Sequence, residues 1–221
     1  MKLFLSLLSF ITFTPFPSQE LKDFSVPKEY EKVLEVKGDL DKDGKEETVI
    51  VYNTPEKIEN QGNKRKFYIL KSTQGNWKIW KENTTILNSS GAGFYPEDNK
   101  LEIQIKNNCL VISQSLYSNS RHTDTSKYTF RFQNGDFYLI GAFNQFEDTC
   151  EFSFTHDVNF STGKAIVDET YSECDGDENR KIPKNDHKEF IHKFDTLIKM
   201  NDFRIGENKF KIPNLKKYFT Y

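Results

Sequence analysis

Alternation of apolar and polar residues is the clearest pattern along this chain, and it predicts antiparallel β-strands. Residues 30–36 and 101–105 place apolar side chains at alternating positions, which is the period of a strand with one buried face. The composition agrees, because 20 Phe and 10 Tyr favour sheets over helical bundles. We therefore predict a mainly β fold, built from antiparallel hairpins and arranged as a β-sandwich or a partly open barrel.

Turn sequences divide these strands into hairpins. Asn134 and Gly135 form the dipeptide that a type I′ turn prefers, because both central residues of that turn need positive φ. A second hairpin is predicted within 67–80, where residues 74–76 separate two apolar runs. A two-residue turn at Asn134 and Gly135 pairs, along one face, Phe132 with Phe137 and Phe130 with Leu139.

The hairpin at 150–174 has two possible registers. A three-residue loop that ends at Gly163 pairs Cys150 with Cys174 and His156 with Asp168. A shift of one residue instead pairs Phe154 with Tyr171 and Val158 with Val167, which buries more apolar surface but turns the cysteines to different faces. A β-bulge would reconcile the two. Both ends of the hairpin lie close together in either register, so we predict a Cys150–Cys174 disulfide and a leftover thiol at Cys109.

The C-terminal part changes its period and predicts one α-helix over 186–200. Asp186 and Glu189 have the spacing of a capping box at its start. The apolar side chains that then fall on one helical stripe are Phe190, Ile191, Phe194, Leu197 and Ile198. His187 and His192 are five residues apart on this helix, so they miss the spacing of four that a zinc-binding helix uses.

Residues 1–18 predict a signal peptide and export to the periplasm or the medium. Lys2 precedes an apolar run that is too short to span a membrane, and no later stretch suits a transmembrane segment. Residues 19–221 are expected to form a single β-rich domain that includes the C-terminal helix. The formal net charge of −2 argues against nucleic-acid binding, which uses strongly basic surfaces.

Residues 39–47 carry the most specific chemistry in the chain. Asp39, Asp41 and Asp43 alternate, a glycine follows, and Glu47 ends the run before an apolar strand. Carboxylates this close repel one another unless water or a cation offsets their charge, and oxygen ligands suit a hard cation such as Ca²⁺. A helix-loop-helix calcium site is excluded, because its twelfth position needs a bidentate Glu and is apolar here.

This loop resembles the Asp-x-Asp-x-Asp-Gly-x-x-Asp loop of the FG-GAP and VCBS families, which joins two strands and binds Ca²⁺. The resemblance implies a structural Ca²⁺ held by the side chains of Asp39, Asp41, Asp43 and Glu47 and by the carbonyl of Lys45. Glu47 departs from the family pattern, in which an Asp stands at that position. The alternative is a solvated acidic turn that holds no ion and whose own lysines offset part of its charge.

Two further segments resemble a group of exported bacterial proteins of unknown function. Residues 127–141 are similar to that group's pattern Phe-Arg-Tyr-Gln-Asn/Asp-Gly-x-Phe-x-Leu-Ile-Gly, and residues 158–164 are similar to its pattern Asn-Tyr/Phe-Leu/Ser-Thr-Gly-Lys. Together with the acidic loop, the resemblance covers most of 36–165. It implies no activity, because the group has none established.

No catalytic motif stands out, so we predict a non-enzymatic protein that binds an envelope or extracellular protein or glycan. The chain lacks a Gly-x-Ser-x-Gly elbow and a glycine-rich phosphate loop. One alternative is a periplasmic hydrolase with a site near His122, Asp124 and the polar loop 88–99, since long loops often carry function. Another is a secreted inhibitor or immunity-type protein that acts through its acidic surface.

Overall fold

The computed structural model describes residues 21–174 and 181–221 of the 221-residue chain. The predicted signal peptide, residues 1–18, lies outside this part. Three antiparallel sheets make up the fold, and no α-helix occurs among the described residues. The prediction of a mainly β fold built from antiparallel hairpins is therefore confirmed.

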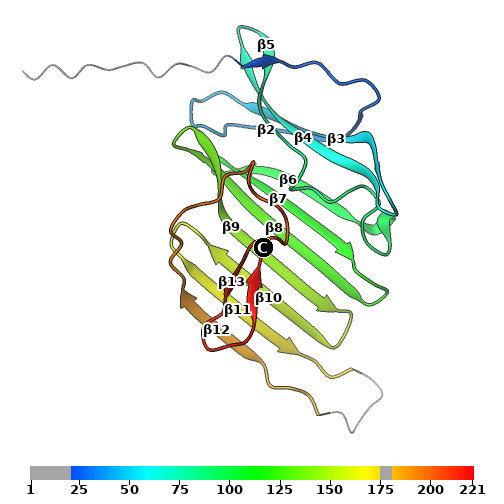
Figure 1. The fold of residues 1–221 in the computed structure, drawn as a ribbon, viewed down its shortest axis with the longest axis vertical. Helices are drawn as coiled ribbons and strands as arrows, with labels where there is room; N and C mark the ends of the chain where they lie inside the picture. The colour runs from blue at the N-terminus through cyan, green and yellow to red at the C-terminus, as the bar shows by residue number, and fades with distance from the viewer. Residues whose placement is uncertain (1–20, 175–180) are drawn as a thin grey trace, which may run out of the picture.

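A five-stranded sheet forms one end of the molecule, at the top of Figure 1. Its spatial order is β1-β5-β4-β3-β2. The strands are β1 (Lys22–Asp23), β2 (Glu31–Gly38), β3 (Glu47–Ile58), β4 (Gly62–Thr73) and β5 (Asn76–Asn83). β4 and β5 form the hairpin predicted within 67–80, and the two turn residues Gln74 and Gly75 have positive φ angles of 52° and 84°.

A seven-stranded sheet forms the larger part of the molecule. A single turn of 3₁₀ helix, η1 (Pro96–Asp98), precedes it. Its strands are β6 (Lys100–Lys106), β7 (Cys109–Tyr117), β8 (His122–Gln133), β9 (Asp136–Asp148), β10 (Phe152–Asn159), β11 (Lys164–Tyr171) and β12 (Asp186–Ile191). They lie side by side in chain order, from β6 at one edge to β12 at the other.

The turn between β8 and β9 has the predicted geometry. Asn134 and Gly135 have φ angles of 51° and 80°, as a type I′ turn requires. The predicted pairs are present, Phe132 with Phe137 and Phe130 with Leu139. This turn is local, so its two residues were sufficient to set the register as far as Phe130. Between Phe130 and Thr129 an irregularity of the β-bulge type shifts the pairing by one residue, which the turn sequence did not predict.

The predicted disulfide between Cys150 and Cys174 is present, with Cα atoms 5.8 Å apart. Both predicted registers of its hairpin are wrong, because β10 and β11 are joined through residues 160–163, one residue more than the predicted three-residue loop. In that loop the Gly163 N–H donates to the carbonyl of Asn159 at 2.7 Å. The observed pairs include Phe152 with Tyr171, Phe154 with Glu169 and His156 with Val167. The disulfide lies beyond the last paired residues, so it does not fix the register.

The predicted α-helix over 186–200 is wrong. Its first residues form β12, which pairs with the outer edge of β11. Exposure along β12 has the period of a strand, since Phe190 is half-buried whereas the adjacent Ile191 is 69% exposed. Pairing with β12 satisfies backbone groups of β11 that would otherwise form an open edge. The spacing of apolar residues within 186–200 could not show that β11, a separate segment, pairs with the start of this stretch.

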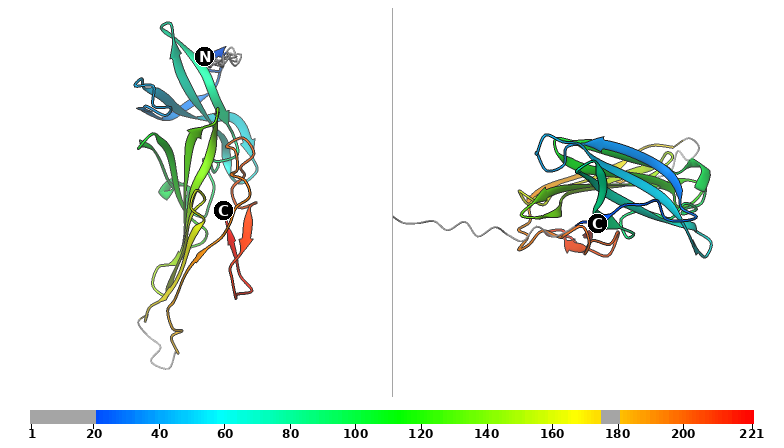
Figure 2. Two further views of the ribbon diagram at one scale, coloured as in Figure 1. Left: turned by 90° about the vertical axis from the view of Figure 1, so that its left-hand side faces the viewer. Right: turned by 90° about the horizontal axis from the view of Figure 1, so that it is seen from above.

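Residues 192–221, here called the C-terminal segment, lie along one face of the seven-stranded sheet (Figures 1 and 2). The segment contains the short strands β13 (Lys209–Lys211) and β14 (Tyr218–Thr220). It is anchored on β9, where the Leu139 N–H donates to the carbonyl of Ile198 at 2.9 Å. Members of the predicted helical stripe pack here against the core without forming a helix, namely Phe194, Leu197 and Ile198.

One continuous hydrophobic core includes side chains of both large sheets and of the C-terminal segment. Where the β8–β9 turn approaches the five-stranded sheet, the ring centroids of Trp80 and Phe137 are 4.8 Å apart. On the other side of the core, the rings of Tyr128 and Phe203 are 4.9 Å apart. The largest fully buried side chains are aromatic, namely Tyr128, Phe67, Phe130, Phe137, Phe203 and Phe219.

Replacing Cys150 and Cys174 together by Ser should lower the free energy of unfolding by about 3 kcal/mol. The bridge joins residues separated by 24 positions, and its removal restores conformational entropy to the unfolded chain. Urea denaturation of both proteins measures the difference. Cys109→Ser is the matched control, since Cys109 is a free thiol. Equal unfolding midpoints for the double variant and the wild type would contradict the expectation.

Candidate functional site

The acidic loop joins two antiparallel strands, as predicted. Gly38 at the end of β2 pairs with Glu47 at the start of β3. The loop also contacts the other large sheet, because the side-chain amide of Asn108, in the β6–β7 turn, donates to the carbonyl of Asp39 at 2.8 Å. Leu40 is buried in the common core. The loop therefore lies where the two large sheets meet.

Backbone N–H groups of the loop hold all three of its aspartates in place, and Asp41 accepts from the N–H of Asp43 at 3.3 Å. The carboxylate of Asp39 accepts from the N–H of Lys42 at 2.6 Å and from that of Gly44 at 3.1 Å. Asp43 accepts from the N–H of Lys45 at 2.9 Å. One carboxylate oxygen from each of Asp39, Asp41 and Asp43 lies within 4.8 Å of the other two. The three aspartates that the sequence predicted as ligands therefore lie together, and Lys45 follows them in the same loop.

Glu47 has a different environment, because its side chain is fully buried. One of its carboxylate oxygens accepts from the N–H of Leu40 at 2.8 Å. The other oxygen, Oε1, is buried and has no hydrogen-bond partner. Burial raises the pKa of this carboxyl group above its ordinary value. Such a group requires a nearby positive charge if it is to remain ionised inside the protein.

Lys71, on β4, supplies a positive charge that the sequence did not indicate. Its ammonium group forms an ion pair with Asp41 and lies 3.3 Å from Asp43 Oδ2 and 3.6 Å from Glu47 Oε1. It also lies 4.7 Å from the ring centroid of Trp80. No local pattern connects this lysine to a loop so far from it in the chain. Only the pairing of β3 with β4 brings them together.

The loop fits a hard divalent cation in its chemistry. The three aspartates offer carboxylate oxygens within 4.8 Å of one another, and Lys45 adds a carbonyl oxygen in the same loop. Glu47 is not part of that cluster of three, but its Oε1 is a buried acceptor that has no hydrogen bond and lies 3.6 Å from Lys71 Nζ. Lys71 contacts the same carboxylates, so its ammonium group and an added cation compete for them. The structure thus shows an acidic cluster with an internal counter-charge.

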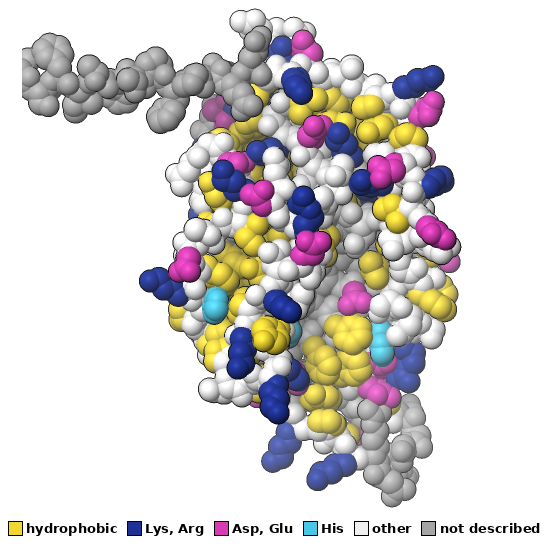
Figure 3. Space-filling view, in the orientation of Figure 1, with side chains coloured by type: hydrophobic (Ala, Val, Ile, Leu, Met, Phe, Trp, Pro, Cys, Tyr) yellow, Lys and Arg dark blue, Asp and Glu magenta, His cyan; other side chains and the backbone are white. Residues whose placement is uncertain are grey.

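A cavity of about 690 Å³ is the second candidate site. It lies between the seven-stranded sheet and the C-terminal segment, on the face that is hollowed in Figure 3. Hydrophobic side chains gather at the lower edge of this hollow. The volume is typical of pockets that hold small molecules.

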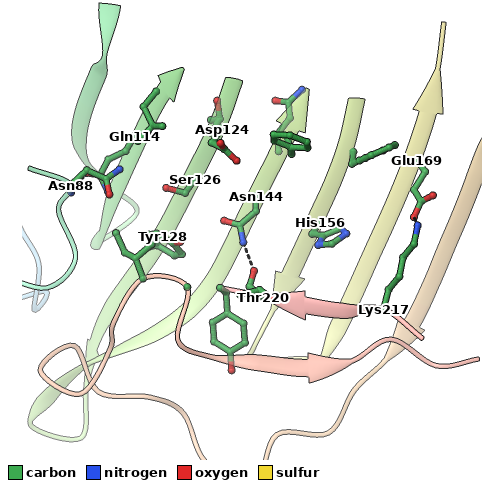
Figure 4. A pocket seen from close by; sticks show the side chains of 18 residues that line it. Asn88, Gln114, Asp124, Ser126, Tyr128, Asn144, His156, Glu169, Lys217 and Thr220 are labelled. Carbon is green, nitrogen blue, oxygen red and sulfur yellow. Dashed lines mark hydrogen bonds and ion pairs between the residues drawn. The ribbon is translucent and has the colours of Figure 1, made fainter. Parts of the chain in front are cut away.

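Cross-strand neighbours arrange the floor of this cavity in two rows. The first row is polar and runs over β7, β8, β9 and β10 through Gln114, Ser126, Asn144 and His156. The second row runs over β7 to β11 through Leu116, Asp124, Phe146, Phe154 and Glu169. Figure 4 shows Ser126, Asn144 and His156 at one level on successive strands. Because side chains alternate between the faces of a strand, all of these residues point to one side of the sheet.

The C-terminal segment covers part of these rows. Thr220 accepts a hydrogen bond from the side-chain amide of Asn144 through its carbonyl, as Figure 4 shows. Lys217 forms an ion pair with Glu169, and the ring of Phe219 lies 5.1 Å from that of His156. Burial lowers the pKa of His156, so its imidazole is neutral at pH 7.

A charged cluster lies next to the cavity, in the cross-strand row beyond the one that contains Asp124 and Phe146. Asp148 is nearly inaccessible and accepts from Arg121 at 2.8 Å, and His122 Nε2 lies 3.2 Å from its other oxygen. The second ring nitrogen of His122 lies 2.9 Å from the amide of Asn119. Both nitrogens of this histidine are therefore engaged, which is not the arrangement of a general base.

The residues of the hydrolase alternative lie close together without forming a catalytic arrangement. His122 and Asp124 project from the same face of β8, two residues apart, and Asp124 lines the cavity. Within the 88–99 loop, Asn88 also lines it, whereas Phe94 and Tyr95 lie in an exposed cluster with Tyr117. The predicted pair of His156 with Asp168 is absent, because the register of β10 and β11 places Val167 opposite His156. The side chain of Asp168 forms an ion pair with His187 of β12.

Most of the cavity was missed by sequence reasoning. Its residues come from positions 88 to 221, and no motif links them. The one available signal was the polar residues that recur at every second position within the predicted sheet, such as Asp124 with Ser126 on β8. Their alignment across four strands depends on registers that only the structure shows.

Comparison of the chain with models of protein families, with curated protein sequences and with solved structures gives no match. The resemblance of the acidic loop to the FG-GAP and VCBS families therefore stays a prediction. Among the described residues, no helix is long and apolar enough to cross a membrane.

Asp148→Asn should lower the free energy of unfolding at pH 7 and have a smaller effect at pH 3. Arg121 and backbone N–H groups hold the pKa of Asp148 well below its ordinary value. In the unfolded chain this carboxyl titrates near pH 4, so its stabilising effect is complete above that pH and is lost as the pH falls toward the folded-state pKa. Urea denaturation at both pH values measures the effect. An equal loss at pH 7 and pH 3 would exclude this electrostatic explanation.

Proposed function

We propose that this protein is an exported, non-enzymatic binding module whose ligand occupies the cavity between the seven-stranded sheet and the C-terminal segment. The observation that carries the proposal is the cavity itself, which combines an apolar lining with a row of hydrogen-bonding side chains. Binding pockets commonly have this combination, since apolar surface contributes affinity and a few polar groups fix orientation. The ligand belongs to the cell envelope or the extracellular medium.

Two features support export. The N-terminal sequence has the composition of a signal peptide. The Cys150–Cys174 disulfide is of the kind that persists in oxidising compartments. Neither feature identifies the compartment, so the proposal covers both the periplasm and the medium.

In this proposal the acidic loop is a structural Ca²⁺ site. Asp39, Asp41, Asp43 and Glu47 supply carboxylate oxygens, and Lys45 supplies its carbonyl. The bound ion screens the repulsion among these carboxylates and ties the start of β3 to the end of β2. The buried Oε1 of Glu47 supports this role, because it lacks a hydrogen-bond partner.

Millimolar CaCl₂ should raise the melting temperature relative to protein treated with a chelator. An ion that binds only the folded state stabilises it by about 2.7 kcal/mol at 100 times its Kd, which corresponds to a shift of roughly 5 to 10 °C for a domain of this size. Thermal unfolding followed by circular dichroism gives the measurement. The Asp41→Asn, Asp43→Asn double variant should lose the response, and a wild-type melting temperature unaffected by Ca²⁺ contradicts the calcium site.

Lys71→Met provides the matched variant for the same experiment. It removes the competing ammonium group, which also lies 4.7 Å from the ring centroid of Trp80, and keeps an unbranched side chain that is one atom shorter. Calcium affinity should rise at least about fivefold, because the ammonium group contacts three carboxylates of the loop and even one exposed ion pair contributes about 1 kcal/mol. Calorimetric titration of the variant and the wild type measures this change, and a weaker affinity in Lys71→Met would show that the two cations do not compete.

A fragment screen by protein-observed NMR tests the binding cavity without assuming a ligand class. Compounds that bind should shift the resonances of Ser126, Asn144 and His156, which lie on three adjacent strands. Ser126→Trp fills the cavity and should abolish these shifts while leaving the spectrum of the five-stranded sheet unchanged. Hits that map elsewhere, or that persist in the filled variant, contradict the proposed binding site.

A further inference from the structure

Asp124 is the one cavity-lining carboxylate without a partner among the described residues. It is half-buried on β8, between Leu116 on β7 and Phe146 on β9. No hydrogen bond or ion pair in the described part of the chain involves its side chain. Figure 4 shows its carboxylate on the same face as Ser126 and Asn144. A carboxylate beside apolar neighbours loses part of its hydration, and here no hydrogen bond or ion pair from the described residues compensates for that loss.

The neighbouring carboxylates on this face are neutralised from within the protein. Glu169, at the far end of the same row, pairs with Lys217 and accepts from the hydroxyl of Tyr171 at 3.1 Å. Asp148, in the next row, pairs with Arg121. Lys217 is the only lysine or arginine in the described lining of the cavity, and it is already paired. The uncompensated charge in the cavity is therefore the single negative charge of Asp124.

Aromatic residues occupy the neighbouring positions of the row that contains Asp124. Phe146 lies directly opposite Asp124 in the sheet, and Phe154 lies opposite Phe146. The ring of Phe152 links them, with centroids 5.5 Å from that of Phe146 and 4.5 Å from that of Phe154. Ring faces attract cations, and the rings offer apolar contact to the body of a ligand.

The polar row supplies hydrogen bonds without adding charge. No described group forms a hydrogen bond with the ring nitrogens of His156, and Asn144 uses its amide N–H in the bond to Thr220. Tyr128 and Tyr221 are neutral at pH 7, because burial raises the pKa of both, that of Tyr128 to about 12. Every ionisable group of the lining other than Asp124 is thus either neutral or paired.

We propose that the cavity binds a small organic cation, an ammonium group on an apolar or aromatic body, and that Asp124 is its counter-ion. The ammonium group donates a charge-assisted hydrogen bond to Asp124, while Phe146 and Phe154 contact the body of the ligand. This inference rests on the proposed binding function and adds the chemical class of the ligand. The complementarity of charge in the cavity distinguishes it from a neutral sugar, which requires no unpaired carboxylate.

Two probes of matched size test the charge requirement on the full chain. 2-Phenylethylamine carries the ammonium group, and 2-phenylethanol replaces it by a hydroxyl group. NMR titration should show 2-phenylethylamine binding at the cavity at least about tenfold more tightly, because charge-assisted hydrogen bonds are the stronger ones. Its affinity should also fall when NaCl is raised from about 0.05 M to 0.5 M, as partly exposed charge pairs are screened. These measurements need no variant.

Asp124→Asn keeps the shape of the side chain and removes its charge. It should reduce the affinity for 2-phenylethylamine at least about tenfold and leave 2-phenylethanol unaffected. Asp157→Asn is the matched control, since Asp157 is exposed on β10 and adjacent to His156, so it points to the opposite face of the sheet. The control removes the same charge from the same sheet and should not change binding of the amine.

The possible failures are distinguishable. Equal affinity for the amine and the alcohol, or an unchanged affinity in Asp124→Asn, overturns the cationic ligand even if both probes occupy the cavity. Preference for a neutral sugar such as methyl α-glucoside overturns it as well and leaves the binding function in place. A cavity that binds no compound of any class in the fragment screen overturns both the inference and the proposed function.

Discussion

Packing of the C-terminal segment against the seven-stranded sheet is the interaction on which the rest of this structure depends. A single sheet leaves both faces in contact with water, and no helix among residues 21–174 and 181–221 covers this one. Aromatic side chains of the segment perform that role, with Phe203 and Phe219 fully buried. The segment does not fill all of the space over the sheet, so the same packing leaves a cavity beside the core. A change in this segment therefore affects both the stability of the fold and the shape of the cavity.

Charge pairing in the described part of the chain also depends on contacts between distant segments. Where carboxylates lie near apolar surface, a basic side chain from another strand or from the C-terminal segment lies beside most of them, as with Lys71 at the acidic loop and Lys217 at Glu169. These pairs differ from surface salt bridges, which contribute little, because their acidic partners are largely buried. Against this background the unpaired Asp124 is informative, since the protein neutralises comparable groups elsewhere.

The two candidate sites differ in how much of each could be predicted from the sequence. The acidic loop is contiguous, so its three aspartates and their spacing were visible before the fold was known, although Lys71 was not. The cavity is assembled from six elements or more, and its rows exist only because strand registers align Ser126, Asn144 and His156. A shift of one residue in any of these strands would turn its members to the opposite face.

The sequence by itself determined the features that depend on neighbouring residues. The strand period, the type I′ turn at Asn134 and Gly135 and the strand context of the acidic loop follow from local geometry. The Cys150–Cys174 pairing was predictable because the two cysteines stand at the two ends of one hairpin. Only the tertiary structure decided the fate of residues 186–191, which became an edge strand because β11 offered unpaired backbone groups. It also decided the register of β10 and β11 and the environment of Asp124. Those outcomes depend on contacts between distant segments, and hydrophobic spacing along one segment does not encode them.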